Sequence, residues 1–374
     1  MSYCYPLLSS LKEKPDGSLF SRRPDLMAIV AGLSRYDIAV DQQMALAKLL
    51  QQAEERELYR ANPRYLAERL GLDERAALRL LLAALHEGIV TLHWDVRCPG
   101  CGATNHRGDS LAALHHNDQC GVCQLSFAPR LDDDVRVTFS IHERLRPLGS
   151  AADDAAFRAA INERLGPTPG HTLLLTSDFQ RLFPQQRLLP DESLNVARVA
   201  VLFTDLAGST AIYARKGDPR AYHLVRLHFD ALFRIAEEHD GLMVKTIGDA
   251  VMAAFEAPAE ALSAALTMQQ AIVELNSQAQ IADDERLILE VGLHVGPSLS
   301  VTLNDRPDYF GTTVNIAARV QGLSHGGDIV FTEAIRADQQ VQALLADHTL
   351  VASAAQLKGI DELVQVYRPV LSGG

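Results

Sequence analysis

Two aspartates could bind hard divalent cations if folding brings them together. Asp205 ends the apolar run RVAVLFTD, which predicts a buried strand, and Asp249 follows 44 positions later in a Gly-Asp pair typical of a hairpin turn. Carboxylate oxygens on neighbouring rigid strands suit Mg²⁺ or Mn²⁺, which keep water ligands and accept substrate phosphates. Taken singly, each aspartate could instead be a cap or a turn residue.

Four of the five cysteines form two pairs whose spacing is typical of a zinc site. The pairs read CPGC and CGVC, and eighteen residues separate them. Such pairs favour a zinc ribbon, in which four thiolates surround one structural Zn²⁺. Disulfides are the alternative, which the lack of an export signal disfavours. The predicted ligands are Cys98, Cys101, Cys120 and Cys123, and Cys4 stands alone without an assigned role.

The elements that must position the two aspartates are predicted between residues 198 and 374. A strand at 198–205 precedes a turn at 217–219 and a long helix at 221–239. Strands at 241–247 and 250–255, a helix at 258–280, a strand at 287–297 and a helix at 312–323 follow. This order predicts an α+β, ferredoxin-like βαββαβ sheet with helices packed on one face. In that topology the first strand end and the hairpin tip lie side by side.

Three further regions are expected ahead of this domain. We expect a helical, winged-helix-like region at 1–97, a zinc ribbon with an associated strand at 98–148, and a connector at 149–197. Within the first region, residues 41–60 predict one amphipathic helix, and residues 63–96 predict a helix, a turn, a helix and a strand. Residues 61–97 hold five basic and five acidic side chains, whereas DNA-reading domains carry a basic excess. We therefore expect a structural or docking role and no nucleic-acid partner.

Charge and hydropathy restrict the partners further. The chain has 374 residues and a formal net charge of −12, of which −11 falls within residues 191–374. That half repels nucleic acid overall, so a small phosphate substrate there needs placed cations or metal ions. No stretch approaches the roughly 20 apolar residues of a membrane span. We expect a cytoplasmic protein without a membrane partner.

Three sequence blocks carry a family resemblance. FTDLAGST at 203–210, GLMVKTIGDAVMAAF at 241–255 and DYFGTTVNIAARV at 308–320 occur in this order. Together they resemble the signature blocks of class III nucleotidyl cyclases, over about residues 198–369. WDVRCPGC, CGVC and VRVTFSI are similar to the ribbon-containing regulatory region found ahead of some bacterial class III cyclases. This second resemblance implies that the N-terminal half is a sensor or scaffold.

The first resemblance implies roles for individual residues. The two metal-binding acids of the family fall on Asp205 and Asp249, and its adenine-selecting pair falls on Lys245 and Asp308. Adenine presents an acceptor at N1 and a donor at N6, so a lysine donor with an aspartate acceptor matches it, whereas guanine reverses the pattern. The pair therefore favours ATP over GTP.

The remaining positions implied by the resemblance concern the phosphates and the ribose. The transition-state asparagine and arginine fall on Asn315 and Arg319, which stand at i and i+4 of the predicted helix. Arg319 can meet the charge that grows on the α-phosphoryl oxygens, and Asn315 can fix the ribose. By the same resemblance, Lys358 falls on the family's C-terminal Lys-Gly segment as a ligand of the outer phosphates, and an exposed lysine without this role is the alternative.

The resemblance implies an adenylyl cyclase that converts ATP into 3′,5′-cyclic AMP and pyrophosphate with two Mg²⁺ or Mn²⁺ ions. In the family, the metal-binding residues of one subunit complete a site with the base- and ribose-binding residues of another. This chain carries both sets once, so the resemblance implies a head-to-tail homodimer as the active unit. Two alternatives remain open. One is a guanylyl or pyrimidine nucleotide cyclase, and the other is a zinc-ribbon regulator whose C-terminal domain binds nucleotide without catalysis.

Overall fold

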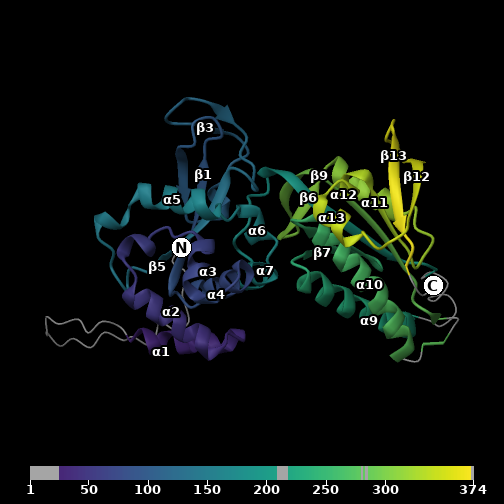
Figure 1. Ribbon diagram of the computed structural model, residues 1–374, viewed down its shortest axis with the longest axis horizontal. Coiled ribbons are helices and arrows are strands. Elements are labelled where there is room, and N and C mark those ends of the chain that lie inside the picture. The colour runs from purple at the N-terminus through teal and green to yellow at the C-terminus, as the bar shows by residue number, and fades with distance from the viewer. Residues whose placement is uncertain (1–24, 209–217, 279–280, 283–284, 372–374) are drawn as a thin grey trace. The chain divides into compact units, whose positions relative to one another are not determined.

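The computed structural model describes residues 25–208, 218–278, 281–282 and 285–371, and these divide into two units (Figure 1). The first unit reaches Leu173 and includes Asp178–Leu189, and the second comprises Leu174–Ser177 and the chain from Pro190 onward. None of the helices in these ranges is both long enough and apolar enough to cross a bilayer. Ser209, Thr210 and the start of the turn predicted at 217–219 lie outside the described residues.

The first unit combines helices with a small antiparallel sheet in the order β2-β1-β5. Its helices are α1 (Leu26–Val30), α2 (Val40–Gln52), α3 (Pro63–Leu70), α4 (Glu74–His86) and α5 (Ala155–Leu165). Helices α6 (Gly170–Leu174) and α7 (Ser177–Leu182) follow at the division between the units. Its strands are β1 (Val90–Arg97), β2 (Thr104–Gly108), β3 (Asp118–Gln119), β4 (Ser126–Phe127) and β5 (Val135–Ile141). Strand β5 pairs along β1, which leads directly into Cys98.

The predicted helix, turn, helix and strand are present as α3, Gly71, α4 and β1, but the single helix predicted over 41–60 is wrong. Helix α2 ends at Gln52, because Ala53 adopts an extended backbone. A separate 3₁₀ turn then forms at Glu55–Glu57. Glu54 caps this turn in a capping box with Glu57, which satisfies the backbone donors that a continuous helix would have used.

The second unit is built on one large sheet in the order β12-β13-β11-β9-β6-β8-β7, with β10 paired to β9. Its strands are β6 (Ser193–Leu206), β7 (Leu242–Ile247), β8 (Ala250–Phe255), β9 (Leu289–Leu303), β10 (Arg306–Phe310), β11 (Ile329–Thr332), β12 (Leu350–Gln356) and β13 (Leu363–Pro369). Its helices are α9 (Asp218–Glu238), α10 (Pro258–Gln278), α11 (Thr312–Gln321), α12 (Glu333–Arg336) and α13 (Gln339–Leu344). The order β6-α9-β7-β8-α10-β9 confirms the predicted α+β class and βαββαβ core.

Helices cover both faces of this sheet, which differs from the packing on one face that the sequence predicted. Alternate side chains of β6, β8 and β9 form one apolar core with α9 and α10, which lie together against the sheet (Figure 1). Helix α11 lies on the opposite face, where β9 places Gly292 and Gly296. A Cβ at Gly292 would lie 2.1 Å from the backbone nitrogen of Gln321 on α11, so only glycine permits this close approach.

A buried histidine of the first unit gives a pH prediction. Burial lowers the pKa of His171 from 6.5 to about 4, so the folded chain holds this ring neutral while the unfolded chain protonates it. Stability should therefore fall as the pH drops from 6.5 toward 4, by up to about 3 kcal/mol from this group. Urea unfolding followed through Trp94, the chain's single tryptophan and a buried residue of the first unit, measures the effect. His171→Asn should flatten the acid slope, and an unchanged slope contradicts the assignment.

Candidate active site and cysteine cluster

Two of the predicted acids lie near each other where strand β6 of the large sheet ends. Asp205 is the penultimate residue of β6, and Asp249 occupies the turn between β7 and β8. Strand β8 runs antiparallel to β6, with Thr204 opposite Val251, so the turn lies beside the end of β6. Gly248 allows this turn because it adopts a left-handed backbone, with φ 66°. Burial, and then repulsion from Asp249, raises the pKa of Asp205.

The chemistry of this acid pair fits a divalent cation. One oxygen of Asp249, Oδ2, is buried and has no hydrogen-bond partner in the described structure. Asp205 Oδ1 accepts a hydrogen bond from the backbone of Leu206 at 3.0 Å, which leaves its Oδ2 available as a ligand. A hard cation bound between two neighbouring carboxylates offsets their mutual repulsion. It would also give the unpaired oxygen of Asp249 a partner.

Glu290 is a third acid beside this pair that the sequence did not reveal. It lies opposite Asp205 in the β6–β9 register. Burial, and then the charge of Asp205, raises the pKa of Glu290, while Gln321 donates a 2.9 Å hydrogen bond to its carboxylate. The sequence predicted the strand at 287–297. It did not show which residue of that strand lies opposite Asp205, because this depends on how the strand pairs with β6.

Lys245 and Asp308 form an ion pair. Lys245 lies on β7 and Asp308 on β10, and Nζ of the lysine is 2.6 Å and 2.9 Å from the two carboxylate oxygens. Asp308 is only 4% exposed and also accepts a 2.8 Å hydrogen bond from the backbone of Tyr309. The exposed ring of Phe310 lies 5.7 Å from the lysine nitrogen, a contact that the sequence did not predict. The pair thus presents a cation, a carboxylate and an aromatic face together.

Breaking this pair should destabilise the second unit. Lys245→Met would leave the buried carboxylate of Asp308 without its cation, which costs about 1–3 kcal/mol. The double variant Lys245→Met/Asp308→Asn should recover part of the loss, because no buried charge then remains. Lys358→Met removes an exposed lysine of the same unit and serves as the matched control. Urea unfolding followed by circular dichroism measures all three, and equal stability of the two lysine variants would contradict the prediction.

Helix α11 carries Asn315 and Arg319, one turn apart. Asn315 is exposed and Arg319 is half-buried, and no ion pair of Arg319 exists among the described residues. Lys358 is exposed and lies next to Gly359, whose Cβ position would be 3.9 Å from the Nη2 atom of Arg319. The Lys-Gly segment is therefore close to Arg319, although no described contact joins either residue to the acids at the end of β6.

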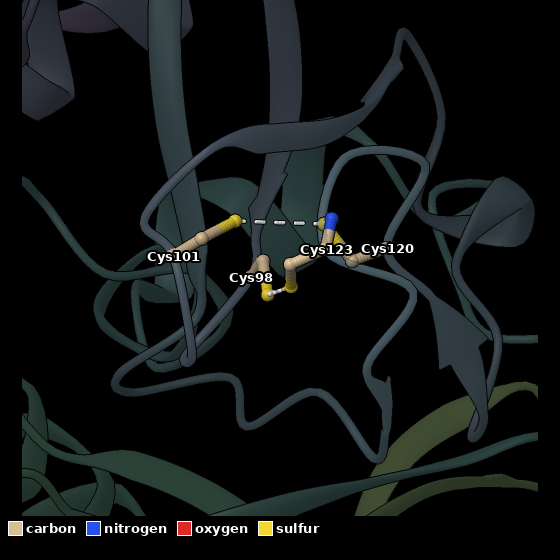
Figure 2. Close-up of side chains that lie close together, drawn as sticks. All are labelled: Cys98, Cys101, Cys120 and Cys123. Atoms are coloured by element: carbon tan, nitrogen blue, oxygen red, sulfur yellow. Dashed lines mark hydrogen bonds between the residues drawn. The ribbon is translucent and has the colours of Figure 1, made fainter.

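The four paired cysteines of the first unit converge on one point (Figure 2). Their Sγ atoms all lie within 4.8 Å of one another, with 3.6 Å between Cys98 and Cys123 and 3.6 Å between Cys101 and Cys120. These distances far exceed a disulfide bond of about 2.05 Å. Four sulfurs at about 2.3 Å from one ion would be about 3.8 Å apart in a tetrahedron. The cluster could therefore hold a metal ion; Cys4 lies outside the described residues.

Two family models match the chain. Residues 192–359 match the adenylate and guanylate cyclase catalytic domain, the segment that holds both acids and the ion pair. Residues 29–160 match a family that is described only as having unknown function.

Curated relatives and solved structures were also compared. An adenylate cyclase of Anabaena cylindrica is 24% identical over 68% of this chain and 54% of that protein. One of Lachancea kluyveri is 30% identical over 39% of this chain and 9% of that protein. The chain thus spans about half of the first relative and a small part of the second. The crystal structure of the adenylyl cyclase CyaB from P. aeruginosa is similar, with 23% identity and a TM-score of 0.42 over 49% of this chain and 97% of that one.

The match of the family model to residues 192–359 coincides with the βαββαβ unit and with the predicted site blocks. The blocks contribute the end of β6, the β7–β8 hairpin and helix α11, which are the elements that carry the acids, the lysine and the arginine. The chain therefore carries a class III adenylate and guanylate cyclase catalytic domain.

Proposed function

We propose that the protein is an adenylyl cyclase that converts ATP into 3′,5′-cyclic AMP and pyrophosphate. The observation that carries the proposal is the carboxylate pair of Asp205 and Asp249, with its mutual repulsion and its orphaned Asp249 oxygen, inside a cyclase catalytic domain. The two curated relatives described above are named adenylate cyclases, which supports this activity. We further propose that it acts in the cytoplasm.

Two divalent cations, Mg²⁺ or Mn²⁺, would supply the acidity that activates the ribose 3′-hydroxyl and the charge that neutralises the triphosphate. Asp205 and Asp249 would hold them, because these side chains offer hard oxygen ligands on adjacent strands. Arg319 would neutralise the charge that develops on the α-phosphoryl oxygens, and Asn315 would orient the ribose from the same helix face. Lys358, close to Arg319 through Gly359, would bind the outer phosphates.

Base selection would rest on Lys245 and Asp308. The lysine can donate to N1 of adenine and the aspartate can accept from its N6 amino group, while guanine would present a donor to the lysine and an acceptor to the carboxylate. Their short ion pair keeps both groups in place before the base arrives. A mismatch of buried polar groups can disfavour the wrong substrate by a factor of roughly 10⁴ to 10⁵.

The catalytic unit would be a homodimer with two equivalent sites. Arg319 carries an unpaired charge among the described residues, and no described contact connects it to the acid pair of its own chain. A second copy, packed head to tail, would bring its base-reading pair and its arginine to the acids of the first. Each isolated chain would then be inactive.

Product analysis tests the proposed reaction. Purified protein is incubated with each of the four ribonucleoside triphosphates and either Mg²⁺ or Mn²⁺, and the products are identified by mass spectrometry. We expect cyclic AMP and pyrophosphate from ATP, with little product from the other nucleotides. Cyclic GMP as the main product would favour the guanylyl alternative, and binding of nucleotide without any cyclic product would favour a non-catalytic regulator.

For the first part of the chain we propose a regulatory region with the boundaries that the sequence indicated. Residues 1–97 would form its winged-helix-like part, residues 98–148 the zinc ribbon with its strand, and residues 149–197 the connector to the catalytic domain at 198–374. The helices α3 and α4 followed by β1 support the winged-helix-like part, and the convergence of the four thiols supports the ribbon.

We propose that the cysteine cluster binds a structural Zn²⁺ ion. Protein purified without chelators should contain a single Zn²⁺ per chain by plasma mass spectrometry, because four thiolates at tetrahedral spacing bind it tightly. Cys120→Ser removes one buried ligand and should lower both the zinc content and the melting temperature. Cys4→Ser is the matched control and should keep the metal. Zinc-free wild-type protein with unchanged stability would contradict the proposal.

A further inference from the structure

We propose that the first unit binds a small polyanion, a molecule with two or more phosphate or carboxylate groups, in a cavity lined by arginines. The cavity measures about 160 Å³ and lies between α5, the segment from Arg56 to Tyr65 and one face of the β2-β1-β5 sheet. Its arginines are Arg56, Arg60, Arg97, Arg107, Arg136 and Arg158. The acids in its lining are Glu57 and Asp95. This inference is independent of the proposed cyclase activity.

The strand register concentrates the positive charge. Asp95 in the central strand β1 has Arg107 of β2 opposite it on one side and Arg136 of β5 opposite it on the other. Arg97 of β1 also lines the cavity, and its charge acts on Arg136. Arg60 from the segment before α3 also contacts the carboxylate of Asp95. Asp95 therefore stands among four guanidinium groups, of which Arg107 also pairs with Asp153 and Arg136 also feels the charge of Asp134.

Arg136 is one of these four cations and is half-buried. It forms no ion pair among the described residues, and its Nε is buried without a hydrogen-bond partner. Burial, and then the charge of Arg97, lowers the pKa of Arg136 to about 10, so the group is still charged at neutral pH. Burying even part of a charge without an ion-pair partner is costly in a folded protein. An anion in the cavity would remove that cost.

Two more arginines in the lining present buried donors without partners. Arg60 Nε and Arg158 Nη1 are both buried and form no hydrogen bond within the described structure. With Arg136, they give three unused guanidinium donors from three separate elements around one cavity. Arg158 and Arg107 also share one acid, Asp153, and Arg56 contacts Glu54 and Asp154.

The donors and the volume define the ligand class. Guanidinium groups bind phosphate and carboxylate oxygens in bidentate geometry, and several converging ones favour a ligand with more than one negative charge. A cavity of about 150 Å³ admits a molecule of the size of benzene. Inorganic pyrophosphate and small tricarboxylates fit this space, whereas a folded macromolecule does not. The overall charge of −12 disfavours unspecific anion binding elsewhere.

Thermal unfolding of the full chain tests the inference. Trp94 fluorescence reports on the first unit, so anion binding to the second unit does not obscure the signal. Pyrophosphate and citrate are tested separately, in buffer without divalent cations and at an ionic strength held constant with NaCl. We expect one or both to raise the melting temperature by about 5–10 °C at about 100 times Kd. A response to pyrophosphate alone indicates phosphate ligands, and one to citrate alone indicates carboxylates.

Matched variants locate the binding. Arg136→Gln should abolish the shift and, without ligand, should melt at the wild-type temperature or above, because a half-buried charge without an ion pair is gone. Arg107→Gln, at the exposed rim, should weaken binding about tenfold in titration calorimetry. Arg164 lies on α5, like Arg158, and forms an exposed ion pair with Glu68 of α3. Arg164→Gln breaks that pair and should keep the full shift. The inference is overturned if neither anion exceeds the NaCl effect, or if Arg107→Gln binds as tightly as the wild type.

Discussion

Asp205→Asn should abolish cyclic AMP formation, with a loss of turnover on the order of 10³ or more. The amide keeps the size of the side chain and removes the negative charge that would hold the cations. The same change should leave the melting temperature equal or higher, because burial and Asp249 already disfavour the ionised form of Asp205. Loss of activity without loss of stability separates a metal-binding role from a structural one.

A structural acid of the same unit provides the control for this variant. Asp338 caps helix α13 and forms an ion pair with Arg198. Asp338→Asn should lower the melting temperature while turnover stays close to that of the wild type. If Asp205→Asn retains more than about a tenth of the activity, Asp205 does not hold the catalytic cations.

Arg319→Ala should reduce turnover by about 10² to 10³, because the charge on the α-phosphoryl oxygens would lose its donor in the transition state. The fold should tolerate the change, since Arg319 has no ion-pair partner among the described residues. Steady-state kinetics with ATP measures the effect as a fall in kcat. Arg319→Lys should recover little, since lysine lacks the bidentate geometry of the guanidinium group.

The control for Arg319 is an arginine of the same unit whose role is structural. Arg336 on α12 forms an exposed ion pair with Glu333, three residues away. Arg336→Ala should change turnover by less than about threefold, because exposed pairs contribute little. A loss of less than tenfold for Arg319→Ala would refute its assigned role.

The core of the catalytic domain was predictable because local patterns determine it. The apolar run that ends at Asp205 and the Gly248-Asp249 turn indicated a strand and a hairpin, and the βαββαβ order then placed them side by side. The ion pair of Lys245 and Asp308 was anticipated only as two residues that read one base. The direct contact between the two side chains requires β10 to fold back along β9 beside β7. No local sequence pattern shows that arrangement.

Features that depend on register or on a competing local interaction were missed. Glu290 faces Asp205 only because β9 pairs with β6 in one particular register. The early end of α2 depends on the capping box of Glu54, which competes with helix propagation. The arginine cavity of the first unit brings together residues from β1, β2, β5 and α5, and their positions in the sequence are too dispersed to suggest a common site.

The most direct test of the account is to mix the two inactive variants. Asp205→Ala chains lack the cation ligands and Arg319→Ala chains lack the transition-state donor, so each homodimer should be inactive. In mixed dimers, one of the two sites combines an intact acid pair with an intact arginine. We predict that mixing equal amounts restores cyclic AMP formation to about a quarter of the wild-type rate, since half of the dimers are mixed and each has one working site. Mixed dimers that form, as shown by differently tagged chains, and yet produce no cyclic AMP would contradict a site shared between two copies.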